Sequence, residues 1–187
     1  RGSAAGVRNV SFSLERGQGG IAVVARLMAR VLGAWHAAQR CEVRALMLMP
    51  VSEPAEFGFP IHSARGQRGR FLLQACRDAA WADGVIYDCA NMARVHGVLP
   101  WKRPSLVYLH GVEVWENARP AWIAACRRAT HRIANSHYTQ ARCAKLHGLA
   151  DIEVCWLATE EAESHPAPRA PALAQRPAQV LILGRIA

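Results

Sequence analysis

Lysine is nearly absent from this chain: only Lys102 and Lys145 among its 23 basic residues are lysines, and the rest are arginines. With 14 acidic residues, the formal net charge is +9. No run of five basic residues occurs, and aromatic residues do not alternate with the arginines, which disfavours a stacking platform for single-stranded nucleic acid. Two explanations of the charge stay open: a genome that favours arginine codons, or an anionic partner such as a phosphorylated substrate, a nucleic acid or an acidic membrane surface.

Closely spaced cysteine pairs are also missing. The six cysteines are scattered without a C-x-x-C motif, which disfavours a structural zinc site and a disulfide framework, and we predict no metal. The longest uncharged apolar run, Ala45 to Val51, is too short to cross a bilayer, and no apolar core follows residues 1–6 as in a signal peptide. We therefore expect reduced thiols and a cytoplasmic location.

The motifs of several enzyme classes are absent as well. The chain has no P-loop, so ATP hydrolysis is not indicated. It has no G-x-S-x-G elbow, and no cysteine stands at an evident helix N-terminus beside a base, so a nucleophilic triad is not indicated.

What the chain does contain is an alternation of short apolar runs and amphipathic segments, with 51% hydrophobic residues overall, too many for a disordered chain. Strands that alternate with helices pair in parallel through right-handed crossovers. The pattern predicts an α/β fold, a Rossmann-like, doubly wound and mostly parallel sheet. We expect strands at 7–12, 42–49, 84–88, 105–109, 131–134 and 152–156, helices at 20–38, 71–82, 91–98, 120–128 and 137–146, and a Pro- and Gly-rich loop between 50 and 70.

Near its C-terminus the chain changes character. A proline-rich stretch at 165–178 is followed by a continuous apolar run at 179–183, which is typical of a strand covered on both faces. We therefore expect a first domain at 1–164, an interdomain linker at 165–178, and the first strand of a truncated second domain at 179–187.

Ligands of such sheets bind beyond the carboxyl ends of the strands, so the residues after each strand are the site candidates. Gly19 and Gly20 follow the first strand and lead into a helix without a capping Ser, Thr, Asp or Asn, so a ligand phosphate could bind the free amides. Gly17, Gly19 and Ala22 also match G-x-G-x-x-A, but the acidic residue expected at the end of the second strand is missing. A dinucleotide cofactor is therefore disfavoured.

Other candidates follow the later strands. His110 comes directly after the strand at 105–109, where its ring can donate or accept a hydrogen bond in the crevice, and Glu113 extends the same wall. Ser136 begins the helix after the strand at 131–134, where it either caps the helix or binds an anion. Arg185 follows the strand at 179–183, where its guanidinium could hold a phosphate.

In their order along the chain, these segments resemble the N-terminal half of the two-domain, retaining glycosyltransferases of family 4, which have the GT-B fold. The resemblance spans nearly the whole chain. It rests on Gly19-Gly20-Ile21 with its helix, His110-Gly111-Val112-Glu113-Val114-Trp115, Ile133-Ala134-Asn135-Ser136-His137-Tyr138-Thr139 and Val180-Leu181-Ile182-Leu183-Gly184-Arg185-Ile186.

The resemblance implies a retaining transfer of a sugar from a nucleotide-sugar donor to a hydroxyl acceptor, in bacterial polysaccharide or glycolipid synthesis, with no other cofactor. It implies that Gly19 and Gly20 approach the donor diphosphate, that His110 contacts the transferred sugar, and that Arg185 neutralises the phosphates of the leaving nucleotide. In this family the first domain chiefly holds the acceptor. The segment after the sixth expected strand, 157–161, departs from the family's Asn-Gly-Val-Asp-like turn, which leaves the contacts of the hinge to substrate open.

Two other functions remain as alternatives. One is a non-catalytic basic module that binds an anionic polymer or nucleic acid, and the other, less favoured, is an NAD(P)-dependent oxidoreductase. The basic segment from Arg65 to Phe71 has apolar neighbours, so a peripheral contact with an acidic membrane carrying lipid-linked acceptors is a further expectation.

Overall fold

The structure is a computed structural model that describes residues 5–15, 19–100 and 102–157. The expected linker at 165–178, the expected strand at 179–183 and Arg185 lie outside the described residues.

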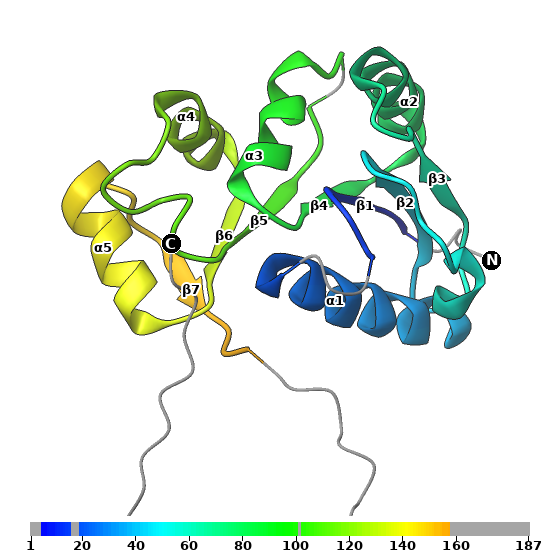
Figure 1. Ribbon diagram of the computed structural model, residues 1–187, viewed down its shortest axis with the longest axis horizontal. Coiled ribbons are helices and arrows are strands. Elements are labelled where there is room, and N and C mark those ends of the chain that lie inside the picture. The colour runs from blue at the N-terminus through cyan, green and yellow to red at the C-terminus, as the bar shows by residue number, and fades with distance from the viewer. Residues whose placement is uncertain (1–4, 16–18, 101, 158–187) are drawn as a thin grey trace, which may run out of the picture.

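A single seven-stranded sheet forms the centre of the molecule (Figure 1). The spatial order is β3-β2-β1-β4-β5-β6-β7, and every neighbouring pair is parallel. This confirms the expected fold class, a Rossmann-like α/β sheet. The strands are β1 (Gly6–Ser11), β2 (Glu42–Met47), β3 (Ile61–Ser63), β4 (Gly84–Tyr87), β5 (Ser105–Leu109), β6 (His131–Ala134) and β7 (Ile152–Val154).

The helices cover the two faces of the sheet unequally. One face packs against α2, α3, α4 and α5, which share one hydrophobic cluster with it, whereas the cluster on the other face receives its helical residues from α1 and the short 3₁₀ helix η1. Figure 1 shows α1 below the sheet and α2, α3 and α4 above it. The bounds are α1 (Gly20–Ala37), η1 (Pro54–Phe57), α2 (Arg68–Trp81), α3 (Ala90–Ala93), the 3₁₀ helix η2 (Arg94–Val98), α4 (Pro120–Arg128) and α5 (His137–His147).

The sequence expectations hold for six strands and five helical segments, with ends that move by a few residues. The loop expected between 50 and 70 is where they fail, because it contains η1, the edge strand β3 and the first residues of α2. β3 has only three residues, and its central residue is His62, so it lacks the apolar run that marks the buried strands. The helix expected at 91–98 is in fact a single α-helical turn continued as η2.

Side chains of the central strands alternate between the two faces, as strand geometry requires. In β5, Val107 and Leu109 are fully buried in the cluster beneath the four helices. Leu106 and Tyr108 point to the opposite face, where α1 does not cover them completely. They line an apolar groove of about 340 Å³ together with Val24, Leu27, Met28, Val31, Leu32, Trp35, Ile86, Ile133, Cys155, Trp156 and Leu157.

Helix α1 is long and apolar enough to span a membrane when judged by length and composition alone. A core helix of a globular domain meets the same criterion, and α1 packs Ala25, Ala29 and Leu32 against the sheet. Its Arg26 is buried: Nη1 donates to the Leu14 carbonyl at 2.9 Å, and Nη2 contacts the two carboxylate oxygens of Glu56 at 2.7 and 2.8 Å. These contacts are those of a helix packed within the domain.

Candidate functional site

The candidate site lies at the carboxyl edge of the sheet, where the strand order reverses between β1 and β4. Hydrogen bonds cross this edge from strand end to strand end. The Phe12 amide after β1 donates to the Asp88 carboxylate at 3.0 Å, and the backbone carbonyl of Asp88 contacts His110 Nε2 at 2.6 Å. Asn135 Nδ2, after β6, donates to the His110 carbonyl at 2.8 Å. The ends of β1, β4, β5 and β6 are thereby held in one polar network.

The glycine pair after β1 begins α1 as expected. Gly19 is the N-cap, with φ of 88°, and no side chain caps the helix. A Cβ placed on Gly19 or on Gly20 would meet no atom within 4 Å among the described residues. The first amides of α1 thus lack a side-chain cap among the described residues, and they stand at the positive end of an 18-residue helix. This geometry suits an anionic ligand, and phosphate contact at Gly19 and Gly20 stays a prediction.

His110 is half-buried and tightly oriented. A backbone carbonyl only accepts hydrogen bonds, so the 2.6 Å contact with the Asp88 carbonyl requires that Nε2 carries the proton. Burial lowers the pKa of His110, although the bond to Asp88 opposes this effect, so the ring is neutral at physiological pH. Its Nδ1 accepts no hydrogen bond from the described part of the chain, so it offers a free lone pair. His110 is thus arranged to accept a hydroxyl proton in a hydrogen bond.

Glu113 lies beneath the loop that follows β5, with only 5% of its surface exposed. One carboxylate oxygen accepts the His110 amide at 3.2 Å, and the other accepts the Ala90 amide at 3.1 Å. Burial raises the pKa of Glu113 to about 7, and the nearby charge of Asp88 adds to the increase while the two amides oppose it. Its visible part is to fasten the loop after β5 to the start of α3, and direct contact with a donor remains a prediction.

Asp88 is a member of this network that sequence reasoning did not select. It was expected as the last residue of a strand, and it lies just after β4 with 1% exposure. Burial raises its pKa to about 6, while the amide of Phe12 is the largest opposing influence. An acidic residue that ends an apolar strand was the available signal, since a carboxylate there must find donors on the neighbouring strand ends.

Ser136 acts as the N-cap of α5. Its hydroxyl accepts the Thr139 amide at 3.2 Å, which is the capping function that the sequence offered as one of two interpretations. The preceding Asn135 accepts the Thr139 hydroxyl at 2.9 Å while it holds the His110 carbonyl. Binding of a ligand by Ser136 is not tested by these contacts and stays a prediction.

Gly111 shapes the loop beside His110. Its φ is 120°, and a Cβ at this position would lie 2.5 Å from the Trp115 ring. The indole therefore packs on the bare backbone, and it also contacts the Tyr138 ring in a T-shaped arrangement, at 5.4 Å between ring centroids. A glycine is required here both by the backbone angle and by the close approach of the ring.

Two further expectations concern metal and thiols. Across residues 5–15, 19–100 and 102–157, no group of three or more His, Cys, Asp or Glu residues is arranged to hold a metal ion. All six cysteines are free: four are buried, Cys76 is half-buried and Cys155 is exposed.

Solved structures share this fold. Anabaena Alr3699/HepE in complex with UDP and glucose superposes with a TM-score of 0.63 at 14% sequence identity, over 81% of this chain and 44% of that one. The complexes of the same protein with UDP and with UDP-glucose each give a TM-score of 0.62 at 14% identity. No protein-family model matches the sequence, and no curated protein matches it. At this identity the likeness establishes the fold alone, and this chain spans less than half the length of the HepE chains.

Proposed function

We propose that this chain is the acceptor-side part of a glycosyltransferase that moves a sugar from a nucleotide-sugar donor to a hydroxyl acceptor with retention of configuration. The observation that carries the proposal is the pairing, on one edge of the sheet, of an uncapped helix N-terminus at Gly19 and Gly20 with a neutral, free-acceptor histidine at His110. The HepE structures of the same fold contain UDP and UDP-glucose, which are the leaving product and the donor of a glucosyl transfer.

The chemistry that the site must assist is the breaking of a sugar–phosphate bond. The nucleoside diphosphate leaves with the bonding electrons, the acceptor oxygen forms the new bond to the sugar, and the hydroxyl proton passes to the departing phosphate oxygen. Negative charge therefore grows on the diphosphate, and amides fixed at a helix N-terminus stabilise such charge without reorganising. In this proposal Arg185, outside the described residues, adds a cation to the same phosphates.

His110 fits the second requirement, which is to orient the transferred sugar. Its proton is held by the Asp88 carbonyl, so its Nδ1 can only accept, and the hydrogen-bond partner of this atom would be a sugar hydroxyl. The protein would act in the cytoplasm in polysaccharide or glycolipid synthesis, on free acceptors or on lipid-linked ones at the inner face of the membrane.

The role of the glycine pair can be tested with two substitutions at Gly20 that have the same shape but differ in charge. Gly20→Asp and Gly20→Asn add side chains of the same size into open space, but only aspartate repels a diphosphate. In the whole natural protein, titration calorimetry with UDP should show about tenfold weaker binding for the aspartate variant than for the asparagine variant. The aspartate variant should also melt at an equal or higher temperature, because an acidic residue suits the first turn of a helix. Equal affinities in the two variants would remove the glycine pair from the donor site.

The role of His110 can be tested with substitutions that each replace the hydrogen-bonding function of only one of its two ring nitrogens. Asparagine places an acceptor near the position of Nδ1, whereas glutamine places a donor near Nε2 and keeps the bond to the Asp88 carbonyl. We expect His110→Ala to lower turnover by about a hundredfold with little change in UDP affinity, and His110→Asn to retain more turnover than His110→Gln. Wild-type turnover in the alanine variant would exclude His110 from the reaction. Steeply salt-dependent binding of nucleic acid, unaffected by the Gly20 variants, would favour the basic binding module instead.

A further inference from the structure

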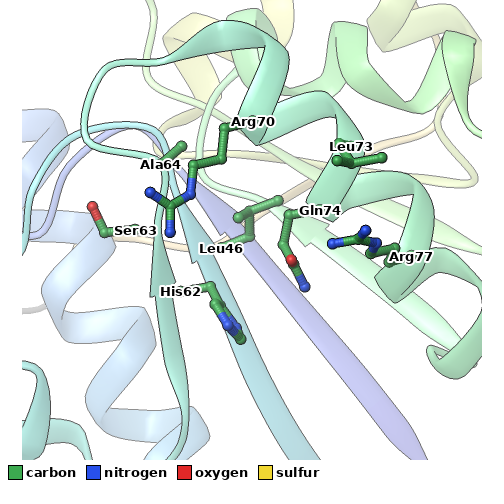
Figure 2. A pocket seen from close by; sticks show the side chains of 8 residues that line it. All are labelled: Leu46, His62, Ser63, Ala64, Arg70, Leu73, Gln74 and Arg77. Carbon is green, nitrogen blue, oxygen red and sulfur yellow. The ribbon is translucent and has the colours of Figure 1, made fainter.

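A groove between the edge strand β3 and helix α2 gathers positive charge away from the centre of the site. Its inner part encloses about 250 Å³, and an adjoining hollow of about 460 Å³ shares His62, Ser63 and Arg70 with it. Together they are called here the basic groove. Figure 2 shows the inner part, with Arg70 reaching from α2 toward β3 and with Gln74 and Arg77 further along the helix. Its polar lining is His62, Ser63, Arg65, Arg70, Gln74 and Arg77.

The arginines of the basic groove have no acidic partner among the described residues, unlike two buried arginines elsewhere in the domain. Arg8 pairs with Asp78, and Arg26 pairs with Glu56. Arg65, Arg70 and Arg77 form no ion pair with any described residue, and neither Asp nor Glu lines the two hollows. Asp78 lies one residue from Arg77 in sequence, but its carboxylate is buried and engaged by Arg8 and Gln74. The groove thus holds three uncompensated cations.

Two of the three cations line the groove from the same helix. Arg70 and Arg77 are seven residues apart on one face of α2, roughly 10 Å along the helix axis, so their long side chains can converge on one group. Each guanidinium presents a planar fork of N–H donors that fits phosphate oxygens in pairs.

The backbone before α2 keeps a third arginine at the mouth of the groove. Arg65 has φ of 51°, a left-handed conformation that costs a non-glycine residue about 1 kcal/mol, and Gly66 beside it has φ of 81°. The turn is fixed by the Gly66 amide, which donates to the Leu48 carbonyl at 2.7 Å, and by the Arg65 amide, which donates to the Ser63 hydroxyl at 3.1 Å. An arginine is thus kept in a conformation that asparagine or glycine adopts more readily.

From these observations we propose that the basic groove binds a phosphate group, held by Arg70 and Arg77 with Arg65 at its mouth. The groove lies on the face of the sheet that α2 covers, whereas α1 packs against the other face, and β3 is separated from β1, which leads into α1, by one strand, roughly 10 Å across the sheet. The inference therefore stands independently of the proposed function. The phosphate belongs either to a soluble molecule or to a lipid headgroup, and the exposed Leu72 and Leu73 beside the groove make the second source worth a separate measurement.

The test uses two double variants that remove the same charge. Arg70→Gln with Arg77→Gln empties the groove of two cations, and Arg40→Gln with Arg94→Gln removes two exposed arginines that do not line it. All four positions are exposed, so both proteins should fold, which thermal melting followed by circular dichroism would verify.

The first probe is inorganic pyrophosphate, followed by titration calorimetry. The second is a pair of vesicle preparations, phosphatidylcholine alone and phosphatidylcholine with phosphatidic acid, followed by sedimentation. We expect the groove variant to lose about tenfold or more in affinity for whichever probe the wild type binds, and the control variant to lose less than about threefold. Binding of pyrophosphate alone identifies a soluble ligand, and binding only of phosphatidic acid vesicles identifies a lipid headgroup. Absence of binding to both probes, or an equal loss in the two double variants, overturns the proposal.

Discussion

The centre and the margin of the carboxyl edge of the sheet carry charged groups of opposite sign in different environments. At the centre, where β4 and β5 end, the charges are two buried carboxylic acids, Asp88 and Glu113, whose oxygens accept backbone amides. At the margin, beside β3, the charges are exposed arginines without acidic partners. The first arrangement holds loops in place and keeps His110 oriented. The second leaves guanidinium groups free to bind an anion. The difference indicates that the centre fixes the positions of side chains, whereas the margin attracts anionic ligands.

The largest effect should come from breaking the centre at Gly111. Gly111→Ala forces a Cβ against the Trp115 ring and adds strain at a φ of 120°, so we expect a loss of about 2–4 kcal/mol in the free energy of unfolding. Chemical denaturation would measure it. Gly148→Ala is the matched control, because its φ is also positive but nothing lies within 4 Å of the added carbon among the described residues, and it should lose only about 1 kcal/mol.

A second variant separates the clash at Gly111 from the backbone strain. Trp115→Leu removes the ring that the new carbon meets, so the cost of Gly111→Ala should be smaller in that background. An unchanged cost would show that the close approach of the ring does not constrain the loop.

The next effect is a pH dependence that originates in Glu113. Its pKa is about 7 in the folded protein and 4.5 ordinarily, so the folded state binds more protons between these values. The stabilising contribution of the protonated acid is therefore fully present below about pH 4.5 and is lost as the pH rises through about 7. Relative to Glu113→Gln, the wild type should lose about 3 kcal/mol over this range, measured by denaturation at each pH.

Asp88→Asn sharpens the same measurement. The charge of Asp88 raises the pKa of Glu113, so its removal should make the wild-type slope shallower. A stability difference between wild type and Glu113→Gln that stays constant with pH would contradict the account of the centre.

The smallest effect on stability is expected at the margin. Arg70→Gln together with Arg77→Gln removes no ion pair, so the free energy of unfolding should change by less than about 0.5 kcal/mol, while phosphate binding falls. Denaturation and calorimetry on the same preparation would separate the two. A loss of several kcal/mol would mean that these arginines support the fold, and the comparison between centre and margin would fail.

The same contrast explains what the sequence could predict. Strands β1, β2, β4 and β5 carry apolar residues next to proline or glycine, and β6 and β7 flank the well-marked helix α5, so their order, and the residues that follow them, could be found. Gly19, Gly20, His110 and Ser136 were reached in this way, and their positions at one edge agree with the structure.

The remaining parts depend on tertiary contacts. The burial of Glu113 and its two amide partners joins residues 23 positions apart, which no local pattern encodes. The edge strand β3 was missed because Ile61-His62-Ser63 is short and mixed in polarity, and it is stabilised by pairing with β2 rather than by its own apolar content. The sequence indicated a basic segment from Arg65 to Phe71, but without β3 its arginines had no groove to line, so the groove itself could not be predicted.

The shortness of β3 has a consequence for how the molecule meets others of its kind. In the described part of the chain, the sheet ends on both sides in strands of three residues, β3 and β7. So short a border exposes few free amide and carbonyl groups, and guanidiniums near β3 repel an identical border brought alongside. At high concentration, copies of this domain should therefore resist aggregation through pairing of their edge strands.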